Sequence, residues 1–177
     1  MSLADTITSA DLRARLEADP ALANARDEQG VSALLLAIYH RREDARDALL
    51  EAGAEIGPLE AAALGDLARL ETADLDARGG DGFTPLHLAA FFGGAPAVKL
   101  LLERGADPDA DNDNAFDVHP IHSAAAVGDH EAVKALLEAG ADPNVTQQGG
   151  LTALDAALHR KDAELEQLLR AHGAVSR

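Results

Sequence analysis

Histidines and carboxylates are the side chains of this sequence with the most obvious chemical capacity. The 177 residues include seven histidines and 31 aspartates and glutamates, but no cysteine. Imidazole and carboxylate groups can bind metal ions or transfer protons. A zinc site on one helix needs the His-Glu-x-x-His spacing, which does not occur here, and the lack of cysteine excludes thiolate ligands. The sequence therefore predicts no zinc site.

The densest group of carboxylates lies between Asp107 and Asp117, where acidic residues alternate with other types. Alternating carboxylates can bind calcium, but a calcium-binding helix–loop–helix needs glycine at its sixth position and glutamate at its twelfth. Counted from Asp107, those positions are Asn112 and Val118, so that motif is absent. An irregular, weak calcium site and a solvated acidic finger both stay open, and the solvated finger is favoured.

Motifs for nucleophilic or phosphate chemistry are also absent from the sequence. It contains no Gly-x-Ser-x-Gly turn, no phosphate-binding glycine-rich loop and no dinucleotide fingerprint. The glycines of residues 79–82 lead into Thr84 and Pro85, the start of a short helix, and therefore indicate a turn. Acid pairs are common, but such a pair needs a shaped pocket to act as acid and base. We predict no catalytic residue, no metal ligand and no cofactor, and we interpret the chain as a non-enzyme.

The net charge of −16 limits the classes of partner. Nucleic acid and anionic membranes both need a basic protein face, so neither is expected to bind directly. A basic or mixed-charge protein fits better. The longest apolar run, from Ala33 to Tyr39, is seven residues, far short of a membrane span, and the first residues lack the pattern of a secretory signal. We expect a monomeric cytoplasmic protein.

An internal repeat indicates the elements that position these residues. Gly-Ala pairs follow apolar stretches at Gly53, Gly105, Gly140 and Gly173, and their alanines are separated by 52, 35 and 33 residues. If Ala73 marks a further member, the first interval divides into 19 and 33 residues. A glycine just past a helix C-terminus adopts the left-handed conformation that is costly for a side chain. Each pair therefore predicts the end of a helix in a repeated unit.

A second motif precedes the helices of each full repeat. Its clearest copy runs from Asp81 to Ala90 as Asp-Gly-Phe-Thr-Pro-Leu-His-Leu-Ala-Ala, and weaker copies begin at Gly30, His119 and Gly150. Asp-Gly forms a tight turn, and Thr or Ser caps a helix. Pro fits the first helical position because its missing N–H costs nothing there.

The Thr-Pro-Leu-His motif, the period near 33 and the glycine after each second helix resemble the ankyrin repeat. The resemblance covers residues 24–177. It implies an all-α solenoid in which each repeat has a β-turn finger and two antiparallel helices. It also implies that His87 and His122 make structural hydrogen bonds within and between the fingers. The high alanine content and short chain are typical of a small, single-domain prokaryotic protein.

We divide residues 1–177, a single ankyrin-repeat domain, into a cap and successive repeats. The cap is 1–26, a full repeat is 27–57, a stunted repeat is 58–78, two full repeats are 79–110 and 111–145, and a C-terminal capping repeat is 146–177. Within the cap, residues 9–18 form an amphipathic stretch with Leu12 and Leu16 on one face. The last repeat has Glu166 and Arg170 where others have apolar residues, as expected of a repeat without a neighbour.

The stunted repeat is 14 residues short of the 33-residue period. We expect Gly57-Pro58 to replace its projecting finger, and the outer helix after Asp66 to be barely two turns long. One interpretation is a neutral deletion that stacking tolerates. The other is a notch in the row of fingers that admits a protrusion of a partner. The neutral deletion is favoured.

The resemblance implies that a partner protein binds along the concave side, made of finger tips and the ends of inner helices. The candidate residues on that side are Tyr39, His40, Asp81, Phe83, Phe91, Phe92, Phe116, Val127, Gln148 and His159. All five aromatic rings of the chain fall in this set. Exposed rings beside acids are typical of interface hot spots. Alternatively, Phe83 and Phe92 pack between neighbouring repeats, and Phe92 fills the gap left by the stunted repeat.

We therefore interpret the chain as a non-catalytic scaffold or inhibitor that binds another protein. One alternative is an acidic mimic of nucleic acid, which would occupy the basic groove of a DNA- or RNA-binding protein. It is disfavoured because the acids are interleaved with alanines and aromatic residues, whereas a mimic needs carboxylates spaced along one face. The other alternative is a small enzyme or metal-binding module.

Overall fold

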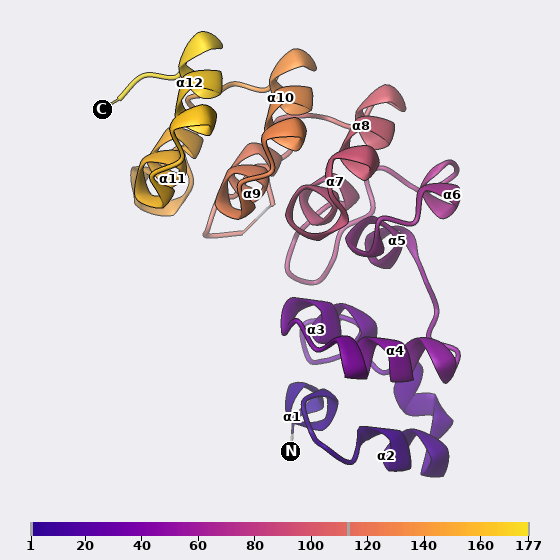
Figure 1. Ribbon diagram of the computed structural model, residues 1–177. Helices are drawn as coiled ribbons and strands as arrows, with labels where there is room; N and C mark the ends of the chain where they lie inside the picture. Colours follow the sequence, from indigo (N-terminus) through magenta and orange to yellow (C-terminus); the bar gives the residue numbers. More distant parts are fainter. Residues whose placement is uncertain (1, 113, 177) are drawn as a thin grey trace.

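A computed structural model describes residues 2–112 and 114–176, which form a curved stack of helix pairs (Figure 1). The helices are α1 (Leu3–Ile7), α2 (Leu12–Ala18), α3 (Ala33–Tyr39), α4 (Glu43–Glu51), α5 (Pro58–Leu64), α6 (Leu67–Leu70), α7 (Pro85–Leu88), α8 (Ala95–Glu103), α9 (Pro120–Val127), α10 (His130–Glu138), α11 (Ala153–Arg160) and α12 (Ala163–Ala171). The 3-10 turns η1 (Pro20–Asn24) and η3 (Gln148–Gly150) and the π-turn η2 (Ala89–Gly93) complete the helical elements. The all-α solenoid predicted from the repeat is confirmed. No helix in the described ranges is long and apolar enough to cross a membrane.

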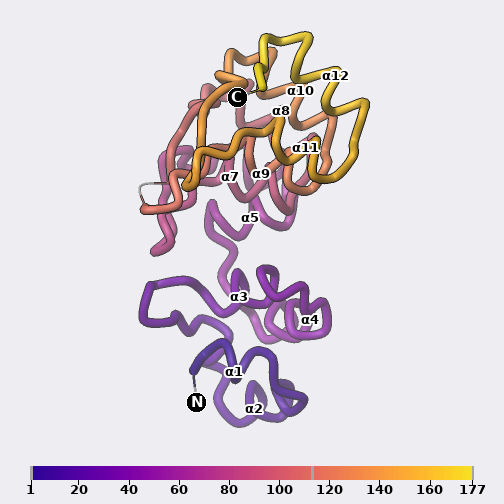
Figure 2. Tube along the Cα trace, turned by 90° about the vertical axis from the view of Figure 1, so that its left-hand side faces the viewer, coloured from indigo at the N-terminus to yellow at the C-terminus, as the bar shows by residue number. Residues whose placement is uncertain are grey.

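The helices form two layers. The inner layer contains α3, α5, α7, α9 and α11, and the outer layer contains α4, α6, α8, α10 and α12. In the cap, α1 contacts α3 and α2 contacts α4, so the cap extends both layers. Leu12 and Leu16 of α2 are buried, as their spacing predicted. In Figure 2 the finger loops extend along the left side, with the inner helices beside them.

Local sequence sets where the helices start and stop. The hydroxyl of Ser32 accepts a hydrogen bond from the N–H of Leu35 at 3.1 Å, and the carboxylate of Asp129 accepts one from Ala132 at 2.9 Å. Both satisfy backbone donors that the first helical turn leaves free. The glycines that end the outer helices have the predicted left-handed backbone, with φ of +87°, +95°, +101° and +95° at Gly53, Gly105, Gly140 and Gly173.

The apolar core runs along the stack as two clusters that meet at α3. One cluster joins α1 to α4 and includes Ile7 and Leu34. The other runs from α3 to α12 and includes Leu35, Leu86 and Leu136. Successive residues of α3 therefore face different clusters, and this helix connects the two parts of the molecule. Each repeat covers the apolar surface of its neighbour, as stacking requires.

The stunted repeat turns the direction of the stack. Its inner helix α5 begins directly at Pro58, with Gly57 before it and no projecting finger. Its outer helix α6 is a single turn of four residues, shorter than the two turns expected. Figure 1 shows α4 lying across the direction of α8, α10 and α12. The stack therefore bends where the outer layer is thinnest.

The fingers on either side of the stunted repeat close on one another, which leaves no room between them for the notch that was the disfavoured alternative. A Cβ placed on Gly80 would lie 1.3 Å from the carbonyl oxygen of Gln29. Because residues 58–78 contribute no finger, the fingers near Gln29 and Gly80 are direct neighbours in space. The free space lies instead at the opposite edge, where inner helices turn into outer helices.

The inner helix of residues 79–110 ends differently from its neighbours. Gly65 and Gly128, which follow α5 and α9, have φ of +67° and +75°. In this repeat the left-handed residue is Gly94, with φ of +80°. Gly93 belongs to η2, and a Cβ there would lie 2.1 Å from the carbonyl oxygen of Ala62. The chain thus uses a π-turn, a rare form that recurs at functional sites, where α5 and η2 approach closely.

Candidate binding groove

Two adjoining hollows lie on the concave side, between the fingers and the inner helices. The first has a volume of about 260 Å³ and is lined by Tyr39, Phe83, His87, Leu88, Phe91, Phe92 and Ser123. The second has a volume of about 220 Å³ and is lined by Phe83, Phe91, Val118, His122, Ser123, Ala126, Gln147, Thr152 and Ala156. Both share Phe83, Phe91 and Ser123, so they form one continuous depression, which we call the concave groove.

An aromatic cluster forms one end of the concave groove. The rings of Tyr39 and Phe92 stack with centroids 5.6 Å apart and an interplanar angle of 18°. Phe91 packs on Phe92 in a tilted arrangement at 4.7 Å. Tyr39, Phe83 and Phe92 are half-buried against the core. The cluster therefore joins α3 to η2 across the stunted repeat, as the alternative for Phe92 proposed, and Phe83 and Phe91 are the rings that both hollows share.

Tyr39 is held in place by Asp81. Its hydroxyl donates a hydrogen bond of 2.7 Å to the Asp81 carboxylate, which lies on the next finger. Burial of the phenol, followed by the nearby charge of Asp81, raises the pKa of Tyr39 far above its usual value. The phenol therefore stays neutral and acts as a donor. Asp81 is thereby partly engaged within the protein.

The two motif histidines are structural, as predicted. Nδ1 of His87 lies 2.8 Å from the hydroxyl of Thr84, and its Nε2 lies 2.8 Å from the carbonyl oxygen of Val118 on the next finger. His122 repeats the arrangement, with Nε2 3.0 Å from the carbonyl oxygen of Val145. Burial lowers the pKa of His87 to about 4 and also lowers the pKa of His122. Each ring is neutral near pH 7 and links one finger to the next.

Phe116 differs from the other rings because it is 61% exposed. Its finger is nevertheless fixed on both sides. The Asn114 side-chain amide donates to the carbonyl oxygen of Asp81 at 2.6 Å, and the Phe116 carbonyl oxygen accepts from the N–H of Gln148 at 2.7 Å. A rigid backbone that presents a solvated ring loses little entropy when it binds.

The remaining candidates lie outside the two hollows. His40, Gln148 and His159 are exposed, and Val127 is half-buried. They belong to the finger tips or to the ends of α3, α9 and α11. The structure therefore brings together four aromatic residues of the expected set in the groove. Phe116 and the four residues outside the hollows are separate surface positions.

The acidic finger uses several of its carboxylates to bind backbone. Asp107 accepts from the N–H of Asp109 at 3.0 Å, and Asp109 accepts from the N–H of Asp142 at 3.0 Å. Among the described residues no three histidine or acidic side chains gather in a way that could hold a metal ion. Asp113 lies outside the described residues. The first of these contacts lies within the finger, and the second connects it to the next finger.

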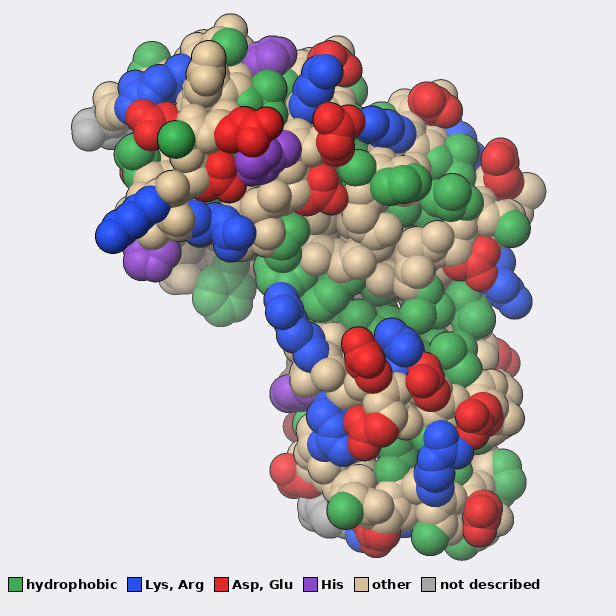
Figure 3. All heavy atoms as spheres, in the orientation of Figure 1, with side chains coloured by type: hydrophobic (Ala, Val, Ile, Leu, Met, Phe, Trp, Pro, Cys, Tyr) green, Lys and Arg blue, Asp and Glu red, His purple; other side chains and the backbone are tan. Residues whose placement is uncertain are grey.

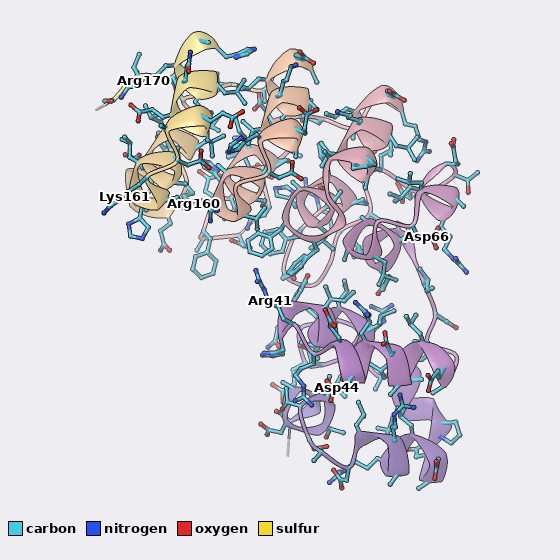
Figure 4. The ribbon with its side chains drawn as sticks, viewed as in Figure 1. Arg41, Asp44, Asp66, Arg160, Lys161 and Arg170 are labelled. Carbon is cyan, nitrogen blue, oxygen red and sulfur yellow. The ribbon has the colours of Figure 1, made fainter. Side chains whose placement is uncertain are left out.

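Sequence reasoning did not identify two basic residues at the edge opposite the fingers. Arg41 follows α3, and Lys161 follows Arg160 at the end of α11 (Figure 4). Arg41 and Lys161 have φ of +52° and +57° and occupy the place that Gly65 and Gly128 occupy in other repeats. That substitution for glycine was the available signal.

The fold and the groove define a class: a helical solenoid whose concave side presents an aromatic depression. Sequence models described as "Ankyrin repeat" and "Ankyrin repeats (many copies)" match residues 81–113 and 121–170. This chain is an ankyrin-repeat protein.

Curated relatives support the same family. The chain is 39% identical over 84 residues to the B-cell lymphoma 3 protein homolog of Mus musculus, a match that covers 48% of this chain and 15% of that protein. It is 38% identical over 108 residues to the Neurogenic locus notch homolog protein 1 of Danio rerio, covering 52% of this chain and 4% of that protein. It is 39% identical over 103 residues to the Neurogenic locus notch homolog protein 2 of Homo sapiens, covering 50% and 4%. The matches therefore span only a small part of each relative.

Proposed function

We propose that this protein is a non-catalytic interaction module that binds a partner protein through the concave groove. The observation that carries the proposal is the distribution of aromatic rings. The chain has only four Phe and one Tyr. Tyr39, Phe83, Phe91 and Phe92 line the groove, and Phe116 lies on a finger that adjoins it. Rings at a partly desolvated centre are what an interface needs to gain affinity.

The dimensions of the concave groove favour side chains of a protein. Its two hollows, of about 260 and 220 Å³, are each large enough for one or two side chains. Their common wall at Phe91 would separate adjacent side chains of a bound strand or helix. The net charge of −16 favours a partner of basic or mixed charge. In this proposal the protein acts as a scaffold or inhibitor and transfers no chemical group.

The acidic-mimic alternative makes a different prediction about the contact surface. A mimic needs carboxylates in the contact, whereas the described residues that line the two hollows carry none. Partner affinity for an apolar groove should depend weakly on salt, and affinity for a mimic should fall steeply with salt. A salt titration of partner binding therefore distinguishes the two.

Site-specific photo-cross-linking tests the proposal. A photoreactive phenylalanine replaces Phe116 in one variant and the exposed Lys134, on the outer helix α10, in a matched control. We expect a discrete cross-linked partner from position 116, which disappears when Phe91→Ala is added, and no such product from position 134. Equal products from both positions, or products insensitive to Phe91→Ala, would contradict the proposal.

A further inference from the structure

A second depression lies where the stack bends, at the edge opposite the fingers. We call it the junction cleft. It has a volume of about 280 Å³, and its apolar floor is formed by Ala37, Ile38, Ala63, Leu64 and Phe92. These residues come from α3 on one side of the bend and from α5 and η2 on the other. Figure 3 shows hydrophobic side chains exposed in this angle, with basic side chains beside them. The cleft exists because the fingers close up and the opposite edge opens.

The charged rim of the junction cleft is predominantly basic. It contains Arg41, Arg42 and Arg46, against one carboxylate, Glu43. Two of the arginines are engaged elsewhere. Arg42 donates to the Asp44 carboxylate at 2.7 Å, and Arg46 lies 2.8 Å from the carboxylate of Asp47.

Arg41 is the cation of this rim that is free. Among residues 2–112 and 114–176, its guanidinium makes no ion pair or hydrogen bond. Arg160 offers a contrast at the end of α11, because its guanidinium donates to the carbonyl oxygen of Ala126 at 3.0 Å. Figure 4 shows Arg41 extending into the angle between the two parts of the molecule. An unpaired guanidinium beside an apolar floor offers a carboxylate a charge-assisted and bidentate contact.

The backbone of Arg41 is unfavourable for any residue except glycine. Its φ is +52°, and the corresponding places after α5 and α9 are Gly65 and Gly128. A residue with a strained backbone, whose guanidinium makes no hydrogen bond or ion pair with the other described residues, points to a role in binding. Here it coincides with the cleft and with the unpaired charge.

We propose that the junction cleft binds a segment of the partner protein in which an apolar side chain lies next to a carboxylate. The apolar side chain fills the cleft, which has room for one large side chain, and the carboxylate pairs with Arg41. Phe92 forms a wall of both the junction cleft and the concave groove, so one partner can reach both. This inference rests on the proposed function and adds an acidic element to a partner expected to be basic or mixed in charge.

Selection from a phage-displayed library of random dodecapeptides tests the proposal. The intact chain is compared with Arg41→Glu, and with Lys161→Glu as a matched control. Lys161 has the same left-handed backbone and also lies at the end of an inner helix. We expect the wild type and Lys161→Glu to enrich peptides with a large apolar residue within two positions of Asp or Glu. Synthetic versions of these peptides should bind Arg41→Glu at least about tenfold more weakly, because an attractive contact becomes repulsive.

Other outcomes separate the two proposals. Peptides without acidic residues that lose binding on Phe91→Ala but not on Arg41→Glu would overturn the junction cleft and leave the concave groove intact. Acid-bearing peptides that lose binding on Arg41→Glu but not on Phe91→Ala would support the cleft, and a set of binders in which none is sensitive to Phe91→Ala would contradict the groove. A library that yields no binder to the intact chain would contradict both. Arg41→Gly removes the charge and suits the positive φ of this position, so it checks that any loss comes from the missing charge and not from misfolding.

Discussion

At the scale of single residues, His87 shows how burial converts a titratable group into a structural one. Its two ring nitrogens contact Thr84 and Val118, and burial lowers its pKa to about 4. In the unfolded chain the imidazole of His87 binds a proton as the pH falls below about 6.5, whereas in the folded chain it stays neutral until about pH 4. Between these two values the unfolded state therefore binds more protons than the folded state. His87 therefore opposes folding increasingly below about pH 6.5, down to about pH 4.

We predict that acidification from pH 7 to pH 5 lowers the free energy of unfolding by about 2 kcal/mol through His87 alone. The lowered pKa of His122 acts in the same direction, and the raised pKa of the half-buried His130, caused mainly by its hydrogen bond to Asp162, opposes them weakly. Urea denaturation at both pH values measures the change. His87→Gln should be less stable at pH 7 and should flatten the dependence on pH. An unchanged pH dependence in that variant would show that His87 is not the group that titrates.

Substitutions of Phe116 and Phe83 should have different effects on partner binding and on stability. We predict that Phe116→Ala changes the free energy of unfolding by less than about 0.5 kcal/mol, because its ring is 61% exposed. The same change should weaken partner binding about 30-fold, as expected of a hot spot. Phe83→Ala, whose ring packs on His87 and the core, should cost about 2 kcal/mol of stability. Thermal unfolding and titration calorimetry measure both quantities, and a large loss of stability in Phe116→Ala would mean that the ring is a core residue.

The repeat motif predicted the structural roles of those residues that recur at a constant spacing. The left-handed glycines and the bonds of His87 and His122 follow from positions that recur in each repeat. The Tyr39–Asp81 hydrogen bond and the Tyr39–Phe92 stack were not predicted. They form across the stunted repeat, where the spacing changes and the number of residues between two positions no longer gives their distance.

At the scale of elements, the close approach of α5 and η2 depends on Gly93. We predict that Gly93→Ala destabilises the protein by about 2–4 kcal/mol, because its Cβ would lie 2.1 Å from the carbonyl oxygen of Ala62. Gly105→Ala is the control, since that position has a φ of +95° but nothing within 4 Å of the added atom. It should cost only about 1 kcal/mol, from backbone strain. Equal costs for the two variants would indicate that the helices separate easily at this contact.

At the ends of α3 and α11, substitution to glycine should raise the stability of the protein. Arg41→Gly should stabilise the protein by about 1 kcal/mol, because glycine adopts a positive φ without strain and the Arg41 guanidinium makes no hydrogen bond or ion pair with the other described residues. Lys161→Gly, at φ of +57°, should give a similar gain. If the junction cleft binds the partner, Arg41→Gly is more stable and binds more weakly. Destabilisation by both variants would show that the basic side chains stabilise these helix ends.

Elements were harder to predict than residues where neighbouring helices meet. The helices of each repeat follow from caps, prolines and glycines in the sequence. The π-turn at Ala89–Gly93 does not, because it depends on how closely α5 approaches. The closing of the fingers at Gln29 and Gly80 likewise depends on which finger is missing and on how the remaining ones move together. Local sequence patterns do not specify such contacts between repeats.

At the scale of the whole molecule, a short repeat has two opposite consequences. It brings the aromatic residues of two full repeats together in the concave groove, and it opens the junction cleft on the other edge. The bend lies where the inner layer is continuous through α3 and α5 and the outer layer contains only the four-residue α6. A deletion that stacking tolerates can therefore still shape the surface that a partner contacts.

The central claim is that the concave groove binds a partner protein. The most direct test uses a purified partner that cross-linking has identified. It compares the affinity of this partner for the wild type with its affinity for a double variant, Phe91→Ala with Phe116→Ala. Titration calorimetry at about 0.1 M and 0.5 M salt gives that affinity with and without strong screening. We predict that the double variant binds at least about 30-fold more weakly at both salt concentrations, while its melting temperature changes little. Unchanged affinity in the double variant, or wild-type affinity that collapses at high salt, would contradict the account.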